Sequence, residues 1–335
     1  MKPTMKDVAE RAGVSKSTVS QYLNKRYSYM SAATRKKIEQ AIEELGYYPN
    51  QIAKSLKQKN THVIAFVCAT LTSRFSLELV ASIEKYFQAE HYSVIIASTD
   101  DDPEKERDLI QSFLARQVDG LIVFPTKENF DFYQRLQQRQ VPLVFVDRFL
   151  AGIDIPSVLL DNKQAGYTAT KALLDHGHRQ IAIMTFPVGD HITTRVERID
   201  GYQAAFKEAA VKAPADNVIS CMPEQVDQEL TALMQRTTPP TALVATNDVL
   251  LEQTLMWVRE HHVQIPQQLS LVGIDDVSFA RLFDPEITTL AQPVQKIGIK
   301  AATLLLAIIA DAKPTAAKVY RYAPQMTNRN SIKTL

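Results

Sequence analysis

Residues 5–24 read MKDVAERAGVSKSTVSQYLN, a pattern typical of two short helices joined by a tight turn. Thr4 is a suitable N-cap for a helix over Met5–Ala12, whose apolar side chains recur at helical spacing. Gly13 provides the permissive backbone that a tight turn requires. Ser15 can then cap a second helix that continues to about Asn24.

A third helix is predicted over Ala32–Leu45, where apolar residues share one face and Gly46 marks the end. Two helices joined by a glycine turn, with a third packed on them, form the helix-turn-helix arrangement. In this arrangement the second helix lies in the major groove of DNA, with its N-terminal side chains on base edges. Residues 1–46 are therefore predicted to form an all-α DNA-binding head.

The second predicted helix carries side chains suited to DNA. Lysine can donate to guanine acceptors and glutamine can pair bidentately with adenine. Hydroxyl and amide groups nearby can donate to phosphates, which position a protein without reading sequence. The predicted base-edge contacts are Lys16, Ser17 and Gln21, and the predicted phosphate contacts are Thr18, Ser20 and Asn24.

The small net charge of +1 conceals an asymmetry along the chain. Residues 1–60 hold 12 Lys or Arg against 5 Asp or Glu, whereas the remainder holds 26 against 32. A basic head on an acidic body is typical of a polyanion-binding module carried by a domain with another task.

Length and composition indicate more than one globular domain. The 335 residues exceed what one hydrophobic core usually organises, and 45% hydrophobic with 22% charged residues is ordinary for a globular protein. No signal peptide can be drawn at the N-terminus, and the apolar run near 301–310 is too short for a membrane span. Cys68 and Cys221 imply no disulfide framework. We expect a cytoplasmic protein with no membrane partner.

The remaining residues alternate between strand-like and helical stretches. Such alternation predicts parallel sheets covered by helices on both faces, and these sheets bind ligands at the carboxyl ends of their strands. Helical patterns lie at Leu77–Glu90, Glu104–Arg116, Ala165–His176 and Glu197–Ala210. The predicted strands are Val63–Cys68, Ser93–Ser98, Gly120–Phe124, Leu143–Val146, Val158–Leu160, Ile181–Thr185, Ala242–Ala245 and Leu271–Ile274.

An enzyme built on this body would need a catalytic motif, and none is found. The sequence has neither a glycine-rich phosphate loop nor a serine nucleophile elbow, and neither cysteine has a histidine at a metal-ligand spacing. The acidic run Asp100–Glu104 could bind a metal, but its place before a helix favours capping instead. We predict no enzyme activity, cofactor or metal. A sugar-binding transport protein would share the body but not the basic head.

The stretch at 5–24, together with TRKKIEQAIEELGYYPNQIAKSLKQKNTHVIAFV at 34–67, resembles the LacI/GalR family of repressors. The body keeps the similar segments LLDNKQAG, HGHRQIAI, RIDGY, ATND, VGIDD and ITTLAQP, so the resemblance spans nearly the full length. It implies a hinge at 47–60 and a periplasmic-binding-protein-like body at 61–335. Lobe 1 would comprise about 61–160 and 293–322, and lobe 2 about 161–292 and 323–335.

The resemblance also implies partners and further contacts. The family's hinge helix inserts a leucine into the minor groove, an apolar wedge that bends DNA. A homodimer would place its two heads on a pseudo-palindromic double-stranded operator. The hinge residues that match the family's DNA contacts are Asn50, Ala53 and Leu56.

The family's ligand contacts match polar and aromatic residues of the body. Carboxylates and amides can bind neighbouring hydroxyls, and an aromatic ring can cover a sugar face. Arg148 and Arg198, with Arg195 one turn away, would suit a carboxylate, and VSKSTVSQYLNKRYSYMS resembles the KdgR-like branch, which responds to the sugar acid 2-keto-3-deoxygluconate. A sugar acid is therefore predicted, with a neutral sugar as the alternative. Arg148 could instead pair with Asp147 or another residue of its lobe. The predicted effector contacts are Phe75, Asp147, Arg148, Arg195, Arg198, Asn247 and Asp275.

Two further pairs receive structural assignments. Asp248 and Asp276 follow predicted strands and are interpreted as helix caps. Asp161 and Asn162 are interpreted as marking a crossover between the lobes.

Overall fold

A computed structural model describes residues 3–28, 30–48, 60–188, 192–311 and 318–335. The chain divides into two compact units, Met1–Thr61 and His62–Leu335, which we call the head and the body. Each is described by itself.

The head consists of α1 (Met5–Ala12), α2 (Lys16–Leu23) and α3 (Ala32–Leu45), as predicted. Thr4 and Asp7 form a reciprocal capping box at the start of α1, and the Ser15 hydroxyl caps α2. Gly13 and Gly46 end α1 and α3 in the left-handed conformation, at φ 65° and 56°. The helices enclose a small core of Val8, Ala9, Ala12, Val19, Met30, Ile38, Ala41 and Tyr47.

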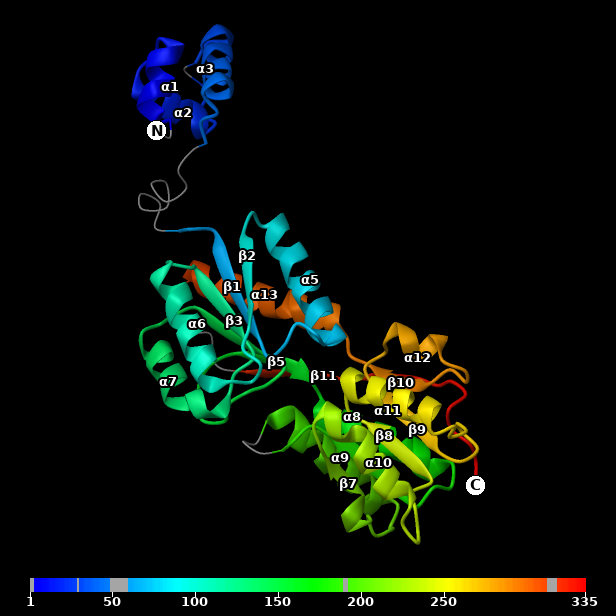
Figure 1. Ribbon diagram of the computed structural model, residues 1–335. Helices are drawn as coiled ribbons and strands as arrows, with labels where there is room; N and C mark the ends of the chain where they lie inside the picture. The colour runs from blue at the N-terminus through cyan, green and yellow to red at the C-terminus, as the bar shows by residue number, and fades with distance from the viewer. Residues whose placement is uncertain (1–2, 29, 49–59, 189–191, 312–317) are drawn as a thin grey trace. The chain divides into compact units, whose positions relative to one another are not determined.

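The first sheet of the body is entirely parallel, in the order β11-β5-β4-β3-β1-β2. Helices α5 (Arg74–Ala89) and α13 (Val294–Asp311) pack on one face, and α6 (Pro103–Ala115) and α7 (Phe130–Gln138) on the other (Figure 1). A 3-10 turn, η1 (Lys127–Asn129), precedes α7. The strands are β1 (Val63–Cys68), β2 (Ser93–Ser98), β3 (Gly120–Val123), β4 (Leu143–Val146), β5 (Ser157–Leu160) and β11 (Val319–Tyr322).

The second sheet has the order β12-β10-β9-β8-β6-β7. Helices α8 (Asn162–Asp175) and α9 (Thr193–Glu208) cover one face; α10 (Val226–Met234), α11 (Asp248–Glu260) and the short α12 (Ser278–Leu282) pack on the other. The 3-10 turns η3 (Ala215–Asn217) and η4 (Pro223–Gln225) flank β7. The strands are β6 (Ile181–Thr185), β7 (Val218–Ser220), β8 (Ala242–Ala245), β9 (Ser270–Ile274), β10 (Thr288–Ala291) and β12 (Gln325–Thr327).

The chain passes between the two sheets three times, after β5, after β10 and after β11. Lobe 1 is therefore β1–β5 with α13 and β11, and lobe 2 is α8–β10 with β12. Asp161 lies at the first passage, where its backbone N–H donates to the Tyr322 carbonyl at the third, at 2.8 Å. The lobes are thus joined by neighbouring segments that are far apart in sequence.

All eight predicted strands are present, but β7, β10, β11 and β12 were not predicted. These strands are short and partly polar, and they owe their extended form to pairing with a neighbour. The two predicted parallel sheets are present, and the second also carries one antiparallel edge strand, β12, paired with β10. An antiparallel edge strand on an otherwise parallel sheet is common in large sheets.

Two glycines allow α8 and α9 to approach closely. A Cβ atom on Gly166 would lie 2.0 Å from the Arg198 carbonyl oxygen, and one on Gly201 would lie 2.0 Å from that of Lys163. No larger side chain fits at such distances. This contact fixes the backbone that carries Arg198.

Candidate functional site

The exposed side of α2 carries the predicted base-reading residues. The side chains of Lys16, Ser17 and Gln21 are exposed at its first and second turns. Lys16 and Gln21 make no side-chain hydrogen bond to any residue that the structure describes, whereas the Ser17 hydroxyl lies 2.6 Å from that of Ser15. Two long donors are thus free on a helix held in place by Val19, which is fully buried.

Of the predicted phosphate contacts, the side chains of Thr18 and Asn24 are engaged within the head. The Thr18 hydroxyl lies 2.8 Å from that of Ser15, and the Asn24 side-chain amide donates to the Ser20 carbonyl at 2.8 Å. These groups therefore stabilise the two ends of α2. The hinge contacts predicted at Asn50, Ala53 and Leu56 lie outside the described residues.

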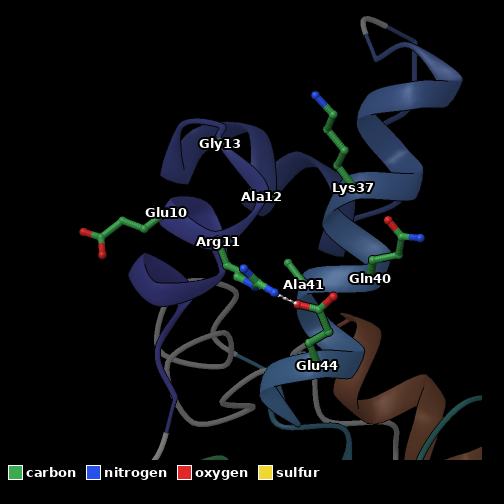
Figure 2. Close-up of a pocket in the computed structure, with 8 residues that line it drawn as sticks. All are labelled: Glu10, Arg11, Ala12, Gly13, Lys37, Gln40, Ala41 and Glu44. Atoms are coloured by element: carbon green, nitrogen blue, oxygen red, sulfur yellow. Dashed lines mark hydrogen bonds and ion pairs between the residues drawn. The ribbon is translucent and has the colours of Figure 1, made fainter.

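A second surface feature of the head is a hollow of about 330 Å³ between α1 and α3 (Figure 2). Figure 2 shows Arg11 and Glu44 facing each other across it; the Arg11 Nε donates to a Glu44 carboxylate oxygen at 2.6 Å. Both side chains are more than half exposed. The pair joins the two helices at the surface, and solvent screens it.

In the body, residues of both lobes line a pocket of about 130 Å³. Phe75 comes from the first turn of α5 in lobe 1, and Asp275 follows β9 in lobe 2. Gln292, at the second passage between the lobes, donates its amide to Asp275 at 2.6 Å. The side-chain oxygen of Gln292 is buried and accepts no hydrogen bond from a described residue. The pocket therefore offers an aromatic face, a carboxylate and an open acceptor.

Arg198 is buried in lobe 2, where two of its guanidinium nitrogens donate to neutral acceptors. Its Nε donates to the Asn162 side-chain oxygen at 2.9 Å, and a terminal nitrogen donates to the Thr246 carbonyl. Asn162 thus has a second task beside marking the passage between the lobes: it orients the Arg198 guanidinium.

The other two predicted arginines converge on Asp101, which lies beyond the end of β2. One Asp101 carboxylate oxygen is 2.7 Å from the Arg148 guanidinium, and the other is 2.8 Å from that of Arg195. Arg148 belongs to lobe 1 and Arg195 to lobe 2, so a single carboxylate bridges the lobes. Arg148 also lies 3.4 Å from Asp147. The alternative that Arg148 pairs within its own lobe is therefore correct for this structure.

The residues of the acidic run at Asp100–Glu104 have different roles. The Asp102 side chain caps α6 by accepting from the backbone N–H groups of Glu104 and Lys105, as predicted. Asp100 pairs with Lys105 at 2.7 Å. Among the residues that the structure describes, no three acidic, cysteine or histidine side chains are grouped to hold a metal ion.

The cap assigned to Asp276 was wrong, whereas Asp248 does cap a helix, though not α11, which begins at Asp248 itself. Asn247 caps α11 by accepting from the Leu250 N–H at 2.9 Å. Asp248 instead faces lobe 1, where its carboxylate accepts from the Arg74 backbone N–H at 2.5 Å and from the Ser73 hydroxyl at 3.0 Å. Lobe 2 thus caps the N-terminus of α5 in lobe 1, a favourable place for a negative charge.

Asp276 serves a different purpose from capping. Its carboxylate accepts from Arg329 at 2.6 Å and from Thr289 at 2.7 Å. These contacts anchor the C-terminal segment to β10. A third bridge between the lobes joins Arg321 of β11 to Glu197 of α9 through two hydrogen bonds of 2.7 Å.

Burial and neighbouring charges set the protonation of the carboxylates. Burial, reinforced by the Asp248 charge, raises the pKa of Asp275 to about 7, although Arg198 opposes the shift. Burial likewise raises the pKa of Asp147 despite the nearby arginines. Burial works against ionisation of Asp101 too, but Arg148 and Arg195 prevail and lower its pKa. Asp101 is thus the anionic centre of the site.

Sequence reasoning did not place Asp101 and Gln292 in this site. It named Asp248 but did not foresee that this residue contacts the other lobe. Asp101 follows a predicted strand, the same signal that selected Asp147 and Asp275, but its place in a capping run obscured it. The partners of Asp101, Gln292 and Asp248 could not be inferred, since these contacts join segments that are far apart in sequence.

Comparisons with known proteins agree with this architecture. Residues 4–50 match the family described as bacterial regulatory proteins, lacI family, and residues 170–332 match the periplasmic binding protein-like domain. The chain is 46% identical over 336 residues to a probable HTH-type transcriptional regulator, EndR, from Paenibacillus polymyxa, with 99% of both chains covered. The chain belongs to the LacI family of bacterial regulatory proteins.

Other LacI-family proteins extend the comparison. The HTH-type transcriptional regulator KdgR of Bacillus subtilis is 33% identical over 90% of both chains. A CelR–cellobiose complex matches with a TM-score of 0.72 and 26% identity, covering 98% of this chain and 99% of that one. The lac repressor dimer bound to operator shares the fold at a TM-score of 0.85, with 23% identity, 99% of this chain covered and 100% of that one.

The predicted class is therefore confirmed: the protein is a DNA-binding transcriptional regulator of the LacI family and not an enzyme. No helix in the described part of the chain is long and apolar enough to cross a membrane.

Proposed function

We propose that this LacI-family regulator is a cytoplasmic homodimeric repressor of a carbohydrate or sugar-acid catabolic operon. Its two heads would read a pseudo-palindromic operator, with Lys16, Ser17 and Gln21 on base edges. Thr18, Ser20 and Asn24 would position α2 on phosphates, and Asn50, Ala53 and Leu56 would contact the minor groove. The exposed donors on a rigid α2 and the operator-bound lac repressor of the same fold support this proposal.

The effector would bind between the lobes and be a sugar acid. The observation that carries this choice is Arg148, whose side chain is 7% exposed. Its Nε and one terminal nitrogen lie near acids but make no aligned hydrogen bond to a described residue. A ligand carboxylate could accept from two neighbouring nitrogens of this guanidinium, in the bidentate geometry that guanidinium favours.

The remaining site residues suit the rest of such a ligand. Phe75 offers a ring face, Asp275 and Asp147 offer acceptors for hydroxyl groups, and Arg195 and Arg198 add positive charge. Asn247 would contribute its side-chain amide beside α11. KdgR is 33% identical to this chain, and the resemblance to the KdgR-like branch makes 2-keto-3-deoxygluconate the first candidate.

Lobe contacts provide a route from effector to DNA. Ligand binding that rearranges the lobes must act on the Asp248–α5 cap and on the Glu197–Arg321 bridge, because both join lobe 1 to lobe 2. A ligand shifts this equilibrium only by its difference in affinity for the two arrangements. Couplings between sites in proteins are typically about 1–3 kcal/mol.

A neutral sugar is the second candidate, and Asp101 is the observation that favours it. Because this carboxylate already pairs with Arg148 and Arg195, it offsets one of their two charges and makes the unliganded site less positive. The similar CelR structure holds cellobiose, a neutral disaccharide.

Fluorescence-anisotropy titration of a labelled operator separates these candidates. The operator is selected from random duplexes by the full-length chain, then titrated with 2-keto-3-deoxygluconate, gluconate, galacturonate and neutral hexoses. We expect only an acid to shift operator affinity, Arg148→Ala to abolish the shift, and Arg135→Ala on the exposed side of α7 to leave it intact. A shift by neutral hexoses alone would exclude the sugar-acid proposal, and no operator selection at all would exclude the repressor.

A further inference from the structure

The loop after β2 holds Asp101 in a fixed position between two arginines. Asp100 and Asp101 both have left-handed backbones, at φ 57° and 60°. The Asp100 N–H donates to the Ala69 carbonyl at 2.6 Å, and Asp102 caps α6 immediately afterwards. The loop is therefore anchored on both sides of Asp101, and its carboxylate is positioned before any ligand arrives.

The Asp101 carboxylate contacts the two arginines in the way that a ligand carboxylate would. Its two oxygens are each directed to a different guanidinium, Arg148 at 2.7 Å and Arg195 at 2.8 Å. The Arg195 contact is an aligned hydrogen bond, whereas the Asp101 oxygen next to Arg148 makes none despite the short distance.

Arg195 has a second anchor that keeps it in place without Asp101. One of its terminal nitrogens donates to the Pro187 carbonyl at 2.8 Å, and its guanidinium lies 5.5 Å from the ring centroid of Phe186. The Arg148 side chain is 7% exposed, and its backbone N–H donates to the Val146 carbonyl at the end of β4, at 2.7 Å. Both arginines would therefore stay at the site if the Asp101 charge were removed.

We infer that Asp101 is a specificity-determining residue that occupies the place of an anion between Arg148 and Arg195 and competes with an acidic effector for them. This inference rests on the proposed function, because it concerns the charge selectivity of the same site. An acidic ligand must displace Asp101 from at least one arginine and thereby release a bridge between the lobes. A neutral ligand can leave the bridge in place.

The test uses the full chain and the pair Asp101→Asn and Asp100→Asn. Both variants remove one negative charge from the same loop, and asparagine tolerates the left-handed backbone of both positions. Affinities for 2-keto-3-deoxygluconate, gluconate and glucose are measured by calorimetry. We expect Asp101→Asn to raise the ratio of acid to neutral affinity by about tenfold, since one competing charge is removed. Asp100→Asn, whose exposed carboxylate pairs with Lys105, should leave the ratio within about twofold.

A second measurement keeps the inference testable whatever the natural effector is. Thermal unfolding is followed in millimolar sulfate against chloride at the same ionic strength. Sulfate should stabilise Asp101→Asn more than the wild type or Asp100→Asn, because the two arginines then lack their internal anion. If the wild type binds no sugar acid, the proposed effector class is wrong, and the sulfate result still decides the role of Asp101. Equal sulfate stabilisation in all three proteins, or an acid-to-neutral ratio that falls in Asp101→Asn, would overturn the inference.

Discussion

The head and the body place their functional side chains in opposite surroundings. In the head, Lys16 and Gln21 project from one eight-residue helix into solvent. In the body, Arg148, Arg198 and Asp275 are each less than 9% exposed and are bound to residues from distant segments. The predicted DNA contacts of the head are therefore independent of one another, whereas the site residues of the body are linked by hydrogen bonds and ion pairs.

This difference predicts which single substitutions affect other residues as well as the one replaced. Removing an exposed donor from the head should subtract one contact and little else. Removing a buried group from the body leaves its partners unpaired, and the cost of an unpaired buried polar group exceeds the worth of the bond itself.

The largest effect is expected for Gly201→Ala. The added methyl group would lie 2.0 Å from the Lys163 carbonyl oxygen, so α8 and α9 must separate. We expect a loss of about 3–5 kcal/mol in the free energy of unfolding, measured by denaturant titration. Gln203→Ala, exposed on the same helix, is the control and should change stability by less than about 0.5 kcal/mol. A small loss at Gly201 would mean that the close approach of α8 and α9 is not required.

The next effect concerns the pH dependence of Asp275. Its pKa of about 7 in the folded protein lies above the ordinary value of 3.8, so the folded state retains a proton that the unfolded state has lost. The contribution of this group to stability is therefore present at low pH and is lost as pH rises from about 4 to 7.

Asp275→Asn, which imitates the protonated form, should match the wild type near the acidic end of this window. At pH 8 it should be more stable by about 2–4 kcal/mol. Asp276→Asn is the contrasting variant: the pKa of Asp276 is lowered by Thr289 and Arg329 against the effect of burial, so this change should reduce stability at neutral pH. Parallel stability–pH curves for the wild type and Asp275→Asn would contradict the assignment.

A smaller effect tests the head. Gln21→Ala should weaken operator binding by about 1–3 kcal/mol and relax the preference at one base pair, because one bidentate contact is lost. Gln40→Ala offers a matched control, since Gln40 is equally exposed but lies on α3 beside the hollow in Figure 2. Anisotropy with single-base operator variants gives both readouts. Equal losses in the two variants would refute α2 as the reading helix.

The smallest effect is expected at the Arg11–Glu44 ion pair of the head. Both side chains are more than half exposed, so Glu44→Ala should cost less than about 1 kcal/mol. Glu197→Gln in the body should cost more, because the Glu197–Arg321 pair is bidentate and its side chains are only 17% and 31% exposed. Urea unfolding of the two variants compares the pairs directly; a larger loss for Glu44→Ala would reverse the contrast between head and body.

The same contrast explains how far the sequence alone could reach. In the head, capping residues, helical spacing and Gly13 are local signals, and all three helices begin and end close to the predicted positions. In the body, buried strands such as β1 and β8 were predicted from apolar runs, but β11, with its alternating exposed residues, became a strand only through pairing with β5. Local patterns cannot report such long-range pairing.

In the candidate site, too, local patterns identified some residues, whereas contacts between distant segments could not be predicted. Polar residues at strand ends identified Asp147, Arg148 and Asp275, because the carboxyl ends of parallel strands meet at one edge. The Asp101–Arg195 and Asp248–Arg74 contacts could not be inferred, since they depend on how two lobes meet. The pairing of Arg148 with Asp101 changes the interpretation most, because it balances a charge that the sequence presented as free.

The central claim is that a ligand of the body controls the affinity of the head for DNA. The most direct test measures the coupling in both directions: operator affinity with and without saturating sugar acid, and sugar-acid affinity with and without saturating operator. Thermodynamic linkage requires one factor for both, and we expect about 5- to 150-fold, in whichever direction the effector changes DNA binding. Equal sugar-acid affinity for the free and the operator-bound protein would contradict the account.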